Sequence, residues 1–400
     1  MAAKENWDTK PLGTVADLCL GKMLDQNKNK GEPLPYLANV NVRWGEFSLD
    51  SLRTMRFEPK EAERYGLKFG DIVMCEGGEP GRCAIWKNQV AGMMIQKALH
   101  RIRPSEVLDY RFLHYNFLHI GQSKGFDQFF TGSTIKHLPL EKLAKVEVSV
   151  PPLSVQRRIA GILSAYDELM ENSQRRIRLL EAMARALYRE WFVHFRFPGH
   201  DKHPRVASPL GDIPQGWEVK KLGEVAEITM GLSPKGNTYN EEEDGTPLVN
   251  GPVEFGERFT KAVKWTTAPT KFCKKGDLVV CVRGSTTGKY VKSDGVYCLG
   301  RGVCGLSSKY QCFVDLLFEN ELSTLLGQTS GSTFPSWTGP QLKNHPVLSP
   351  PPELLARFED AAAPMAEQAL ALQRKIQNLR QTRDLLLPRL LSGQVNLAEN

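Results

Sequence analysis

The stretch from Gly132 to Leu163, GSTIKHLPLEKLAKVEVSVPPLSVQRRIAGIL, decides the architecture of this chain because a second version of it follows. That version runs from Gly331 to Ala362 and reads GSTFPSWTGPQLKNHPVLSPPPELLARFEDAA. Both copies open with Gly-Ser-Thr, contain a Pro-Pro pair and lead into a long segment of helical character. An internal repeat of this kind predicts two copies of one module in a single chain.

Two shorter segments repeat in the same order. The sequence LGTVADL at residues 12–18 returns as LGEVAEI at 222–228, and GDIVMC at 70–75 returns as GDLVVC at 276–281. Each half therefore has the same predicted order, which is a strand-rich block, a Pro-Pro stop and a long helix. The unequal offsets between the copies are expected where insertions fall in loops.

The composition is that of an ordinary globular protein. The chain has 400 residues, of which 41% are hydrophobic and 24% charged, so two to three domains are expected. The opening MAAKENWDTK is too polar for a signal peptide, and no apolar run approaches the ~20 residues of a membrane helix, so we expect a cytoplasmic protein. The eight cysteines form no CxxC motif, which favours buried thiols over disulfides or zinc.

The net charge of +7 and the isoelectric point of about 8.9 favour an anionic partner. Positive and negative groups nearly balance, so nucleic-acid binding has to come from local patches of Lys and Arg. On charge alone, a slightly basic protein that binds no nucleic acid is an equally good interpretation.

The helical segments carry apolar residues at alternating spacings of four and three, which predicts a heptad seam. The equivalent seams predict that the two helices pair antiparallel as a coiled coil; each helix covering only its own sheet is the alternative. We expect a kink near Pro364 and a helix end or break near Pro388. The predicted seam residues are Ile159, Leu163, Tyr166, Met170, Ile177, Leu180, Leu187, Trp191, Phe358, Met365, Leu372, Ile376, Leu379 and Leu386.

Glycine-rich turns follow the repeated strands, with EGGEPGR at residues 76–82 and VRGSTTGK at 282–289. Backbone N–H groups in such turns can approach a phosphate, although the same residues are typical of β-hairpin loops. The segment GSTTGK is not a nucleotide-binding loop. The spacing from Gly284 to Gly288 is one residue short, and Tyr290 stands where Ser or Thr would bind magnesium.

The Gly-Ser-Thr loops, TGSTIKH at residues 131–137 and GSTFPSW at 331–337, combine hydroxyls, Lys, His and aromatic side chains. Hydroxyls, amides and Lys commonly contact phosphate, and Arg and His can reach base edges. A capped turn that only positions the next strand is the structural alternative. The predicted DNA contacts are Arg82, Ser133, Thr134, Lys136, His137, Arg283, Ser285, Lys289, Ser332, Thr333 and Trp337.

Catalytic motifs are missing from the sequence. It contains no HExxH, no GxSxG, no DPPY-type or NPPF-type motif and no GxGxxG that opens a strand-to-helix unit. His194, His200 and His203 lie in HFRFPGHDKHP, which is better explained as a linker than as a metal site. We predict no catalytic residue, metal ligand or cofactor site in this chain.

Three segments carry a resemblance to a known family. They are PPLSVQRRIAGILSAYDELMENSQRRIRLLEAMARALYREWFVHF at residues 151–195, IPQGWEVKKLGEVAEI at 213–228 and PRLLSGQV at 388–395. Together they resemble the specificity subunits of type I restriction-modification enzymes. The resemblance implies a non-catalytic chain with two target-recognition domains that read a bipartite double-stranded DNA sequence. It also implies modification subunits that carry S-adenosylmethionine, methylate adenine and dock on the helices, and a motor-nuclease subunit that joins the complex.

The predicted fold is α+β and pseudo-two-fold symmetric, with two tandem strand-rich recognition domains joined by two long antiparallel helices. The expected parts are recognition domain 1 at 1–150, a central helix at 151–197, a linker at 198–210, recognition domain 2 at 211–349 and a C-terminal helix and tail at 350–400. A stand-alone DNA methyltransferase or nuclease, and a coiled-coil scaffold that binds only protein, are the alternative functions.

Overall fold

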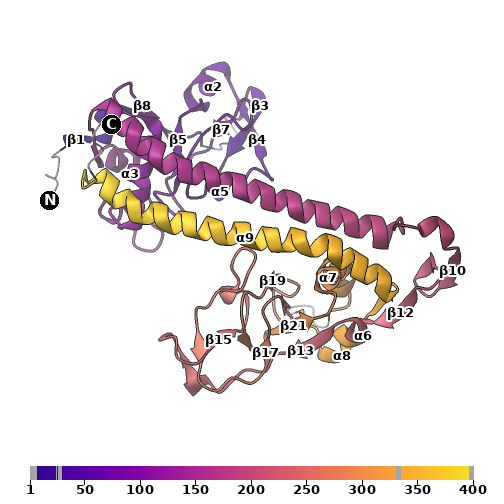
Figure 1. Ribbon diagram of the computed structural model, residues 1–400. Coiled ribbons are helices and arrows are strands. Elements are labelled where there is room, and N and C mark those ends of the chain that lie inside the picture. The colour runs from indigo at the N-terminus through magenta and orange to yellow at the C-terminus, as the bar shows by residue number, and fades with distance from the viewer. Residues whose placement is uncertain (1–6, 24, 26–28, 330–334, 396–400) are drawn as a thin grey trace. The chain divides into compact units, whose positions relative to one another are not determined.

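The computed structural model describes residues 7–23, 25, 29–329 and 335–395 (Figure 1). The chain forms two compact units. Unit 1 contains Met1–Gln174 and Arg374–Asn400, and unit 2 contains Arg175–Gln373. The two longest helices each contribute to both units.

Unit 1 is built on a four-stranded antiparallel sheet with the order β2-β8-β5-β6. A second sheet has the order β4-β3-β7, and β1 pairs with β9. The strands are β1 (Thr9–Pro11), β2 (Ala16–Leu20), β3 (Glu32–Leu37), β4 (Arg53–Phe57), β5 (Ile72–Cys75), β6 (Cys83–Ile85), β7 (Met94–Ile95), β8 (Leu99–Pro104) and β9 (Glu147–Ser149).

Unit 2 repeats this plan. Its main sheet has the order β13-β21-β18-β19, β12 pairs with β22, and a further sheet has the order β14-β16-β15-β20-β17. The strands are β10 (Arg205–Ser208), β11 (Gly211–Pro214), β12 (Glu218–Lys221), β13 (Glu227–Met230), β14 (Tyr239–Asn240), β15 (Thr246–Val249), β16 (Trp265–Thr266), β17 (Phe272–Cys273), β18 (Leu278–Cys281), β19 (Tyr290–Lys292), β20 (Tyr297–Leu299), β21 (Val303–Ser307) and β22 (Pro346–Ser349).

The helices also correspond between the units. In each unit a short helix precedes the first strand of the main sheet, a longer helix follows the sheet, and another short helix precedes the last strand. The helices are α1 (Leu12–Val15), α2 (Pro59–Tyr65), α3 (Tyr110–Gln122), α4 (Leu140–Leu143), α5 (Leu153–Tyr188), α6 (Leu222–Val225), α7 (Gln311–Gly327), α8 (Gly339–Asn344) and α9 (Pro352–Leu391).

Every residue of the central strands β5 (IVMC) and β18 (LVVC) is buried. A continuous apolar run is expected where a strand is covered on both faces, and helices α3 and α7 contribute Phe112 and Phe313 to the same cores. The predicted α+β class and the two tandem domains are confirmed, because both halves of the chain fold to the same sheet order.

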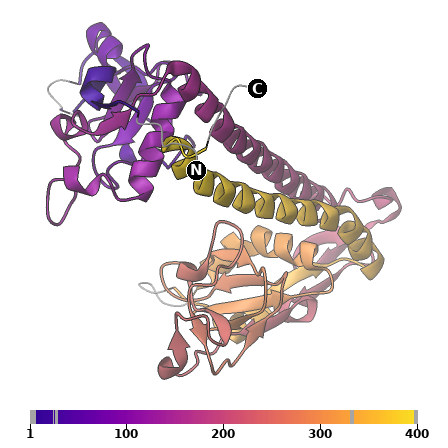
Figure 2. The same ribbon diagram turned by 60° about the vertical axis from the view of Figure 1, so that its left-hand side comes forward.

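Within each unit, segments of α5 and α9 lie side by side and run antiparallel. In unit 1 the first turns of α5 lie beside the last turns of α9 (Figure 1 and Figure 2), and Asp167 pairs with Arg383. In unit 2 the end of α5 lies beside the start of α9, and the rings of Tyr188 and Phe358 are 6.3 Å apart.

The helix boundaries differ from the sequence-based expectation. Helix α5 ends at Tyr188 rather than near Phe197, and a π-helical turn covers Arg189–Val193. Phe195 then adopts a positive φ of 57°, which a helix cannot continue through. Part of the expected linker at 198–210 is the strand β10, which pairs with β11.

Helix α9 runs through Pro364 and ends at Leu391, shortly after Pro388, so the helix end expected near Pro388 is confirmed. Each proline removes one N–H donor, but the other backbone hydrogen bonds and the burial of Ala362, Leu387 and Leu390 hold the helix together. All the cysteines are free, and all except Cys312 are buried, as their positions in apolar strands predict.

Candidate nucleic-acid interface

Two loops that are distant in the sequence meet at one end of the main sheet of unit 1. We call residues 76–82 and 131–137 loop pair 1. The backbone N–H of Leu138 donates to the carbonyl oxygen of Glu76 over 2.8 Å, and Gly77 and His137 form an isolated β-bridge. The glycine-rich turn and the Gly-Ser-Thr loop are therefore parts of one surface.

Unit 2 contains the same arrangement, which we call loop pair 2 and define as residues 282–289 and 335–337. The backbone N–H of Trp337 donates to the carbonyl oxygen of Val282 over 3.0 Å, and Arg283 and Ser336 form the β-bridge. The hydroxyl of Thr287 donates to the carbonyl oxygen of Pro335 over 2.7 Å and fixes the two loops together.

The turns of the two loop pairs have equivalent backbones. The N–H groups of Cys75 and Cys281 donate to the carbonyl oxygens of Arg82 and Lys289, in both cases over 2.8 Å. Glycines at positive φ shape both turns, with Gly78 at 82° and Gly284 at 83°. Only glycine adopts this conformation without strain, so the duplicated glycines fix the duplicated shape.

Most of the predicted contacts in the described residues are accessible. They are Ser133, Thr134, Lys136, Arg283, Ser285 and Lys289, which are exposed, and His137, which is half-exposed. The predicted contacts Ser332 and Thr333 lie outside the described residues.

Arg82 corrects one prediction, because its side chain is buried. It is 8% exposed, donates to the carbonyl oxygen of Asn39 over 2.9 Å and pairs with Glu79 at 2.8 Å. Burial and these two contacts tie the glycine-rich turn to Asn39, so the Arg82 guanidinium is not available to a phosphate in this conformation. Asn39 is far away in the sequence, which is why the turn motif alone gave no sign of this contact.

Trp337 corrects a second prediction. It is 2% exposed, its indole N–H donates to the carbonyl oxygen of Leu325 over 2.8 Å, and its ring packs edge-on against Phe318 at 6.3 Å. It is a core residue of unit 2. Its position in the repeat matches Leu138, which is also buried. The apolar residue at the equivalent position in the first copy could have indicated that Trp337 is a core residue.

The exposed groups of loop pair 1 include acidic neighbours. The Nδ1 atom of His137 lies 3.4 Å from Oε2 of Glu76, and the ammonium of Lys136 lies 3.9 Å from Asp127. Both contacts are at the surface, where ion pairs contribute little to stability and can be exchanged for others. These side chains can therefore turn toward a ligand at small cost.

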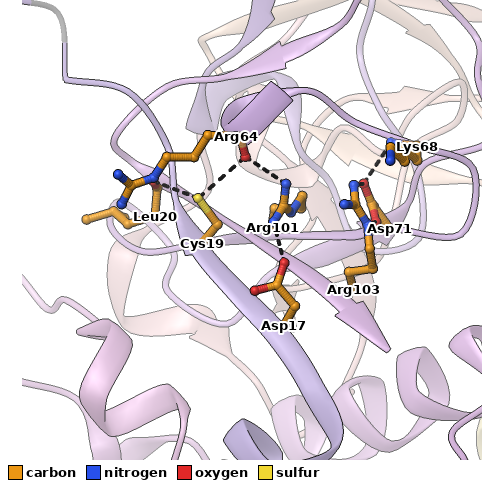
Figure 3. Close-up of polar contacts among 8 residues, drawn as sticks. All are labelled: Asp17, Cys19, Leu20, Arg64, Lys68, Asp71, Arg101 and Arg103. Carbon is orange, nitrogen blue, oxygen red and sulfur yellow. Dashed lines mark hydrogen bonds and ion pairs between the residues drawn. The ribbon is translucent and has the colours of Figure 1, made fainter. Parts of the chain in front are cut away.

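An ion-pair network that the sequence did not indicate stiffens the sheet carrying loop pair 1 (Figure 3). On β8, Arg101 pairs with Asp17 at 2.5 Å and Arg103 makes two bonds of 2.7 Å to Asp71. Hydrogen bonds from Arg103 to Asp71 raise the pKa of the guanidinium. Arg101 also donates to the carbonyl oxygen of Arg64 over 2.7 Å and so ties helix α2 to this sheet.

The predicted seam side chains are all buried or half-buried. Ile159 and Leu163 belong to the core of unit 1, together with Leu387 and Leu390 of α9. Phe358 belongs to the core of unit 2. These three seam residues therefore pack into the cores of the units.

No three His, Cys, Asp or Glu side chains of the described residues are grouped so that they could hold a metal ion. His200 and His203, which the sequence placed in a linker, lie near Phe197 in ring contacts of 6.3 Å and 5.4 Å. Among the helices in the described part of the chain, none is long and apolar enough to span a membrane.

The chain is thus a two-domain protein in which each domain carries a similar loop pair and two long helices contribute to both domains. The chain belongs to the type I restriction-modification DNA specificity family, since the family model described as "Type I restriction modification DNA specificity domain" matches residues 4–182 and 214–354. The predicted resemblance is confirmed.

Individual relatives agree with this assignment. The MjaIX specificity subunit of a type I restriction enzyme from Methanocaldococcus jannaschii is 22% identical, over 99% of this chain and 95% of the relative. The putative MjaX specificity subunit of the same organism is 26% identical over 76% of this chain and 72% of its own length. The crystal structure of a type I S subunit from M. genitalium has a TM-score of 0.59 at 16% identity and covers 98% of this chain and 97% of that chain, which shows a shared fold.

Proposed function

We propose that this chain chooses the DNA sequence on which a type I restriction-modification complex acts. Each recognition domain places its loop pair against one half of a bipartite double-stranded DNA target, and α5 and α9 determine the gap between the halves. One observation carries this proposal. The same pair of loops is built twice, with the same backbone bonds, on sheets of the same strand order.

The chemistry of the loop pairs suits a nucleic acid. The hydroxyls of Ser133, Thr134 and Ser285 and the ammonium groups of Lys136 and Lys289 are typical phosphate contacts. His137 and Arg283 can form hydrogen bonds with base edges in the major groove. Phosphate contacts fix the position of each domain, and a few base contacts supply the sequence choice.

The chain itself is non-catalytic in this proposal. Modification subunits bind S-adenosylmethionine, transfer the methyl group to adenine and dock on the helices, and a motor-nuclease subunit joins through the complex. Large apolar side chains exposed on the helices support a docking role, since such side chains mark protein contacts. They are Leu169 (47% exposed), Leu179 (55%), Met183 (54%) and Leu385 (69%). The complex acts on DNA in the cytoplasm.

The test is methylation-sensitive sequencing of DNA from cells that express this chain with its modification subunit. We expect methylated adenines in one bipartite motif, and no methylation when either protein is omitted. Methylation or cleavage by the purified chain alone would identify a stand-alone enzyme instead. Assembly with the modification subunit without sequence-dependent DNA retention would identify a protein scaffold.

A further inference from the structure

The β-bridge between the two loops is formed by a different pair of residues in each loop pair. Gly77 is bridged to His137 in loop pair 1, and Arg283 is bridged to Ser336 in loop pair 2. The positions are equivalent, because the next backbone bonds, from Leu138 to Glu76 and from Trp337 to Val282, are also equivalent. Each bridge therefore pairs one long side chain with a small residue, glycine or serine. The long side chain, His137, lies on the Gly-Ser-Thr loop in loop pair 1, whereas Arg283 lies on the glycine-rich turn in loop pair 2.

In loop pair 1 the imidazole occupies the space above the glycine. A Cβ atom placed on Gly77 would lie 3.0 Å from Nδ1 and 3.2 Å from Cε1 of His137, which is closer than ordinary contact. Glu76 supports the imidazole from the same turn at 3.4 Å. A longer residue at position 77 would therefore have to displace this imidazole.

Loop pair 2 has the reverse arrangement. Ser336 is short, and the exposed Arg283 forms no hydrogen bond or ion pair within the described part of the chain. Val282, at the position of Glu76, is fully buried and apolar, so no carboxylate at that position competes for the guanidinium. The backbone bonds of loop pair 2 therefore hold an exposed guanidinium that has no ionic partner among the described residues.

The backbone of the loop pairs is the same in both domains, so it cannot make the two domains prefer different bases. A side chain that differs between the domains can do so. We propose that this bridged pair is a specificity-determining position in each recognition domain, and that Arg283 reads a guanine in the half-site of domain 2 through its O6 and N7 atoms. Arg is the side chain that most often makes this two-point contact. His137 occupies the equivalent place in domain 1 and reads the other half-site. The inference rests on the proposed DNA-reading function.

The test exchanges the pairs within the full complex. The variant Arg283→Gly with Ser336→His gives domain 2 the pair of domain 1, and Gly77→Arg with His137→Ser does the opposite. Gly77 lies outside the positive-φ region, so an arginine is compatible with its backbone. Methylation-sensitive sequencing should show a changed base at one position of one half-site, with the other half-site and the gap unchanged. Preference for the original base should fall on the order of 10- to 100-fold.

Arg283→Lys is the second variant, because it keeps the charge and disturbs the fold least. We expect it to lose preference for guanine at that position while the complex still binds DNA. An equal loss over all sequences, with unchanged base preference, would identify a phosphate contact and overturn the inference. If the wild-type complex methylates no bipartite motif, the proposed function fails instead. If the wild-type complex methylates a bipartite motif but both exchanges leave that motif unchanged, only this inference fails.

Discussion

The hydroxyl of Tyr115 donates a hydrogen bond of 2.5 Å to Oδ2 of Asp167. The other carboxylate oxygen of Asp167 accepts a bond of 2.5 Å from Arg383. One side chain thus joins α3 of recognition domain 1 to both α5 and α9 within unit 1. Burial, followed by the Asp167 carboxylate, raises the pKa of Tyr115, so that the hydroxyl stays protonated and continues to donate.

The Asp–Arg pair of this contact does not recur in the second copy. In the register of the repeat, Asp167 and Arg383 correspond to Ala366 and Ala184. In unit 2, α5 is joined to the domain by ion pairs between Glu181 and Arg258 at 2.8 Å and between Arg185 and Glu319 of α7 at 3.4 Å. The two domains are therefore joined to α5 and α9 by different polar contacts, although their sheets have the same strand order.

Removal of the Asp167 carboxylate should destabilise unit 1. Asp167→Ala leaves the buried Tyr115 hydroxyl without its acceptor and removes a partner of Arg383, which costs about 2–4 kcal/mol. Tyr115→Phe removes only the donor and should cost about 1 kcal/mol. Urea unfolding measures both, and Glu168→Ala, on an exposed neighbour, is the matched control. Equal stability of the Asp167 and Glu168 variants would contradict this role.

Acid should weaken the fold through His114. This imidazole is 4% exposed, and burial lowers its pKa to about 4, so it is neutral in the folded protein at pH values where the unfolded chain binds a proton. The free energy of unfolding is therefore unaffected by His114 above the unfolded pKa of about 6.5. It decreases by on the order of 3 kcal/mol as the pH falls from there toward 4.

Denaturant unfolding at several pH values measures this effect. His114→Gln should show a shallower loss of stability between pH 6.5 and 4 than the wild type does. The exposed His200→Gln variant should retain the wild-type slope. Parallel curves for the wild type and the His114 variant would show that this imidazole does not couple folding to protons.

Lys136 and Lys289 should contact phosphates. Lys136→Ala or Lys289→Ala should weaken DNA binding by the complex equally for all sequences, and should reduce the slope of log affinity against log salt by about 1. Titrations at several salt concentrations measure that slope. The exposed Lys202→Ala variant removes the same charge away from the loop pairs. A base-dependent loss would assign these lysines to sequence reading.

The length of the helices should determine the gap between the half-sites. Four residues inserted between Gln174 and Arg175 lengthen α5 by ~6 Å, close to two base pairs at ~3.4 Å each. The methylated motif should therefore acquire a wider gap with unchanged half-sites. Sequencing of methylated DNA measures the gap, and an insertion in the turn at Gly199, outside the helix, should leave it unchanged.

The local patterns of the sequence predicted much of the fold. The apolar runs IVMC and LVVC became fully buried strands, and the repeated glycines became turns at positive φ. The heptad spacing identified the buried face of α5 and α9. The end of α5 was missed, because the aromatic cluster of Phe192, Phe197 and Trp217 draws the chain out of a segment with good helical periodicity.

The sequence by itself determined that one module occurs twice, with its strands, turns and helices in the same order. These features depend on short-range properties, namely apolar periodicity and the freedom of glycine at positive φ. Only the tertiary structure decided which loop side chains face solvent. Asn39 and Leu325 withdraw Arg82 and Trp337 from the surface, while Arg283 and His137 stay accessible. Burial depends on neighbours that are far apart along the chain, so spacing alone could not separate the two kinds of residue.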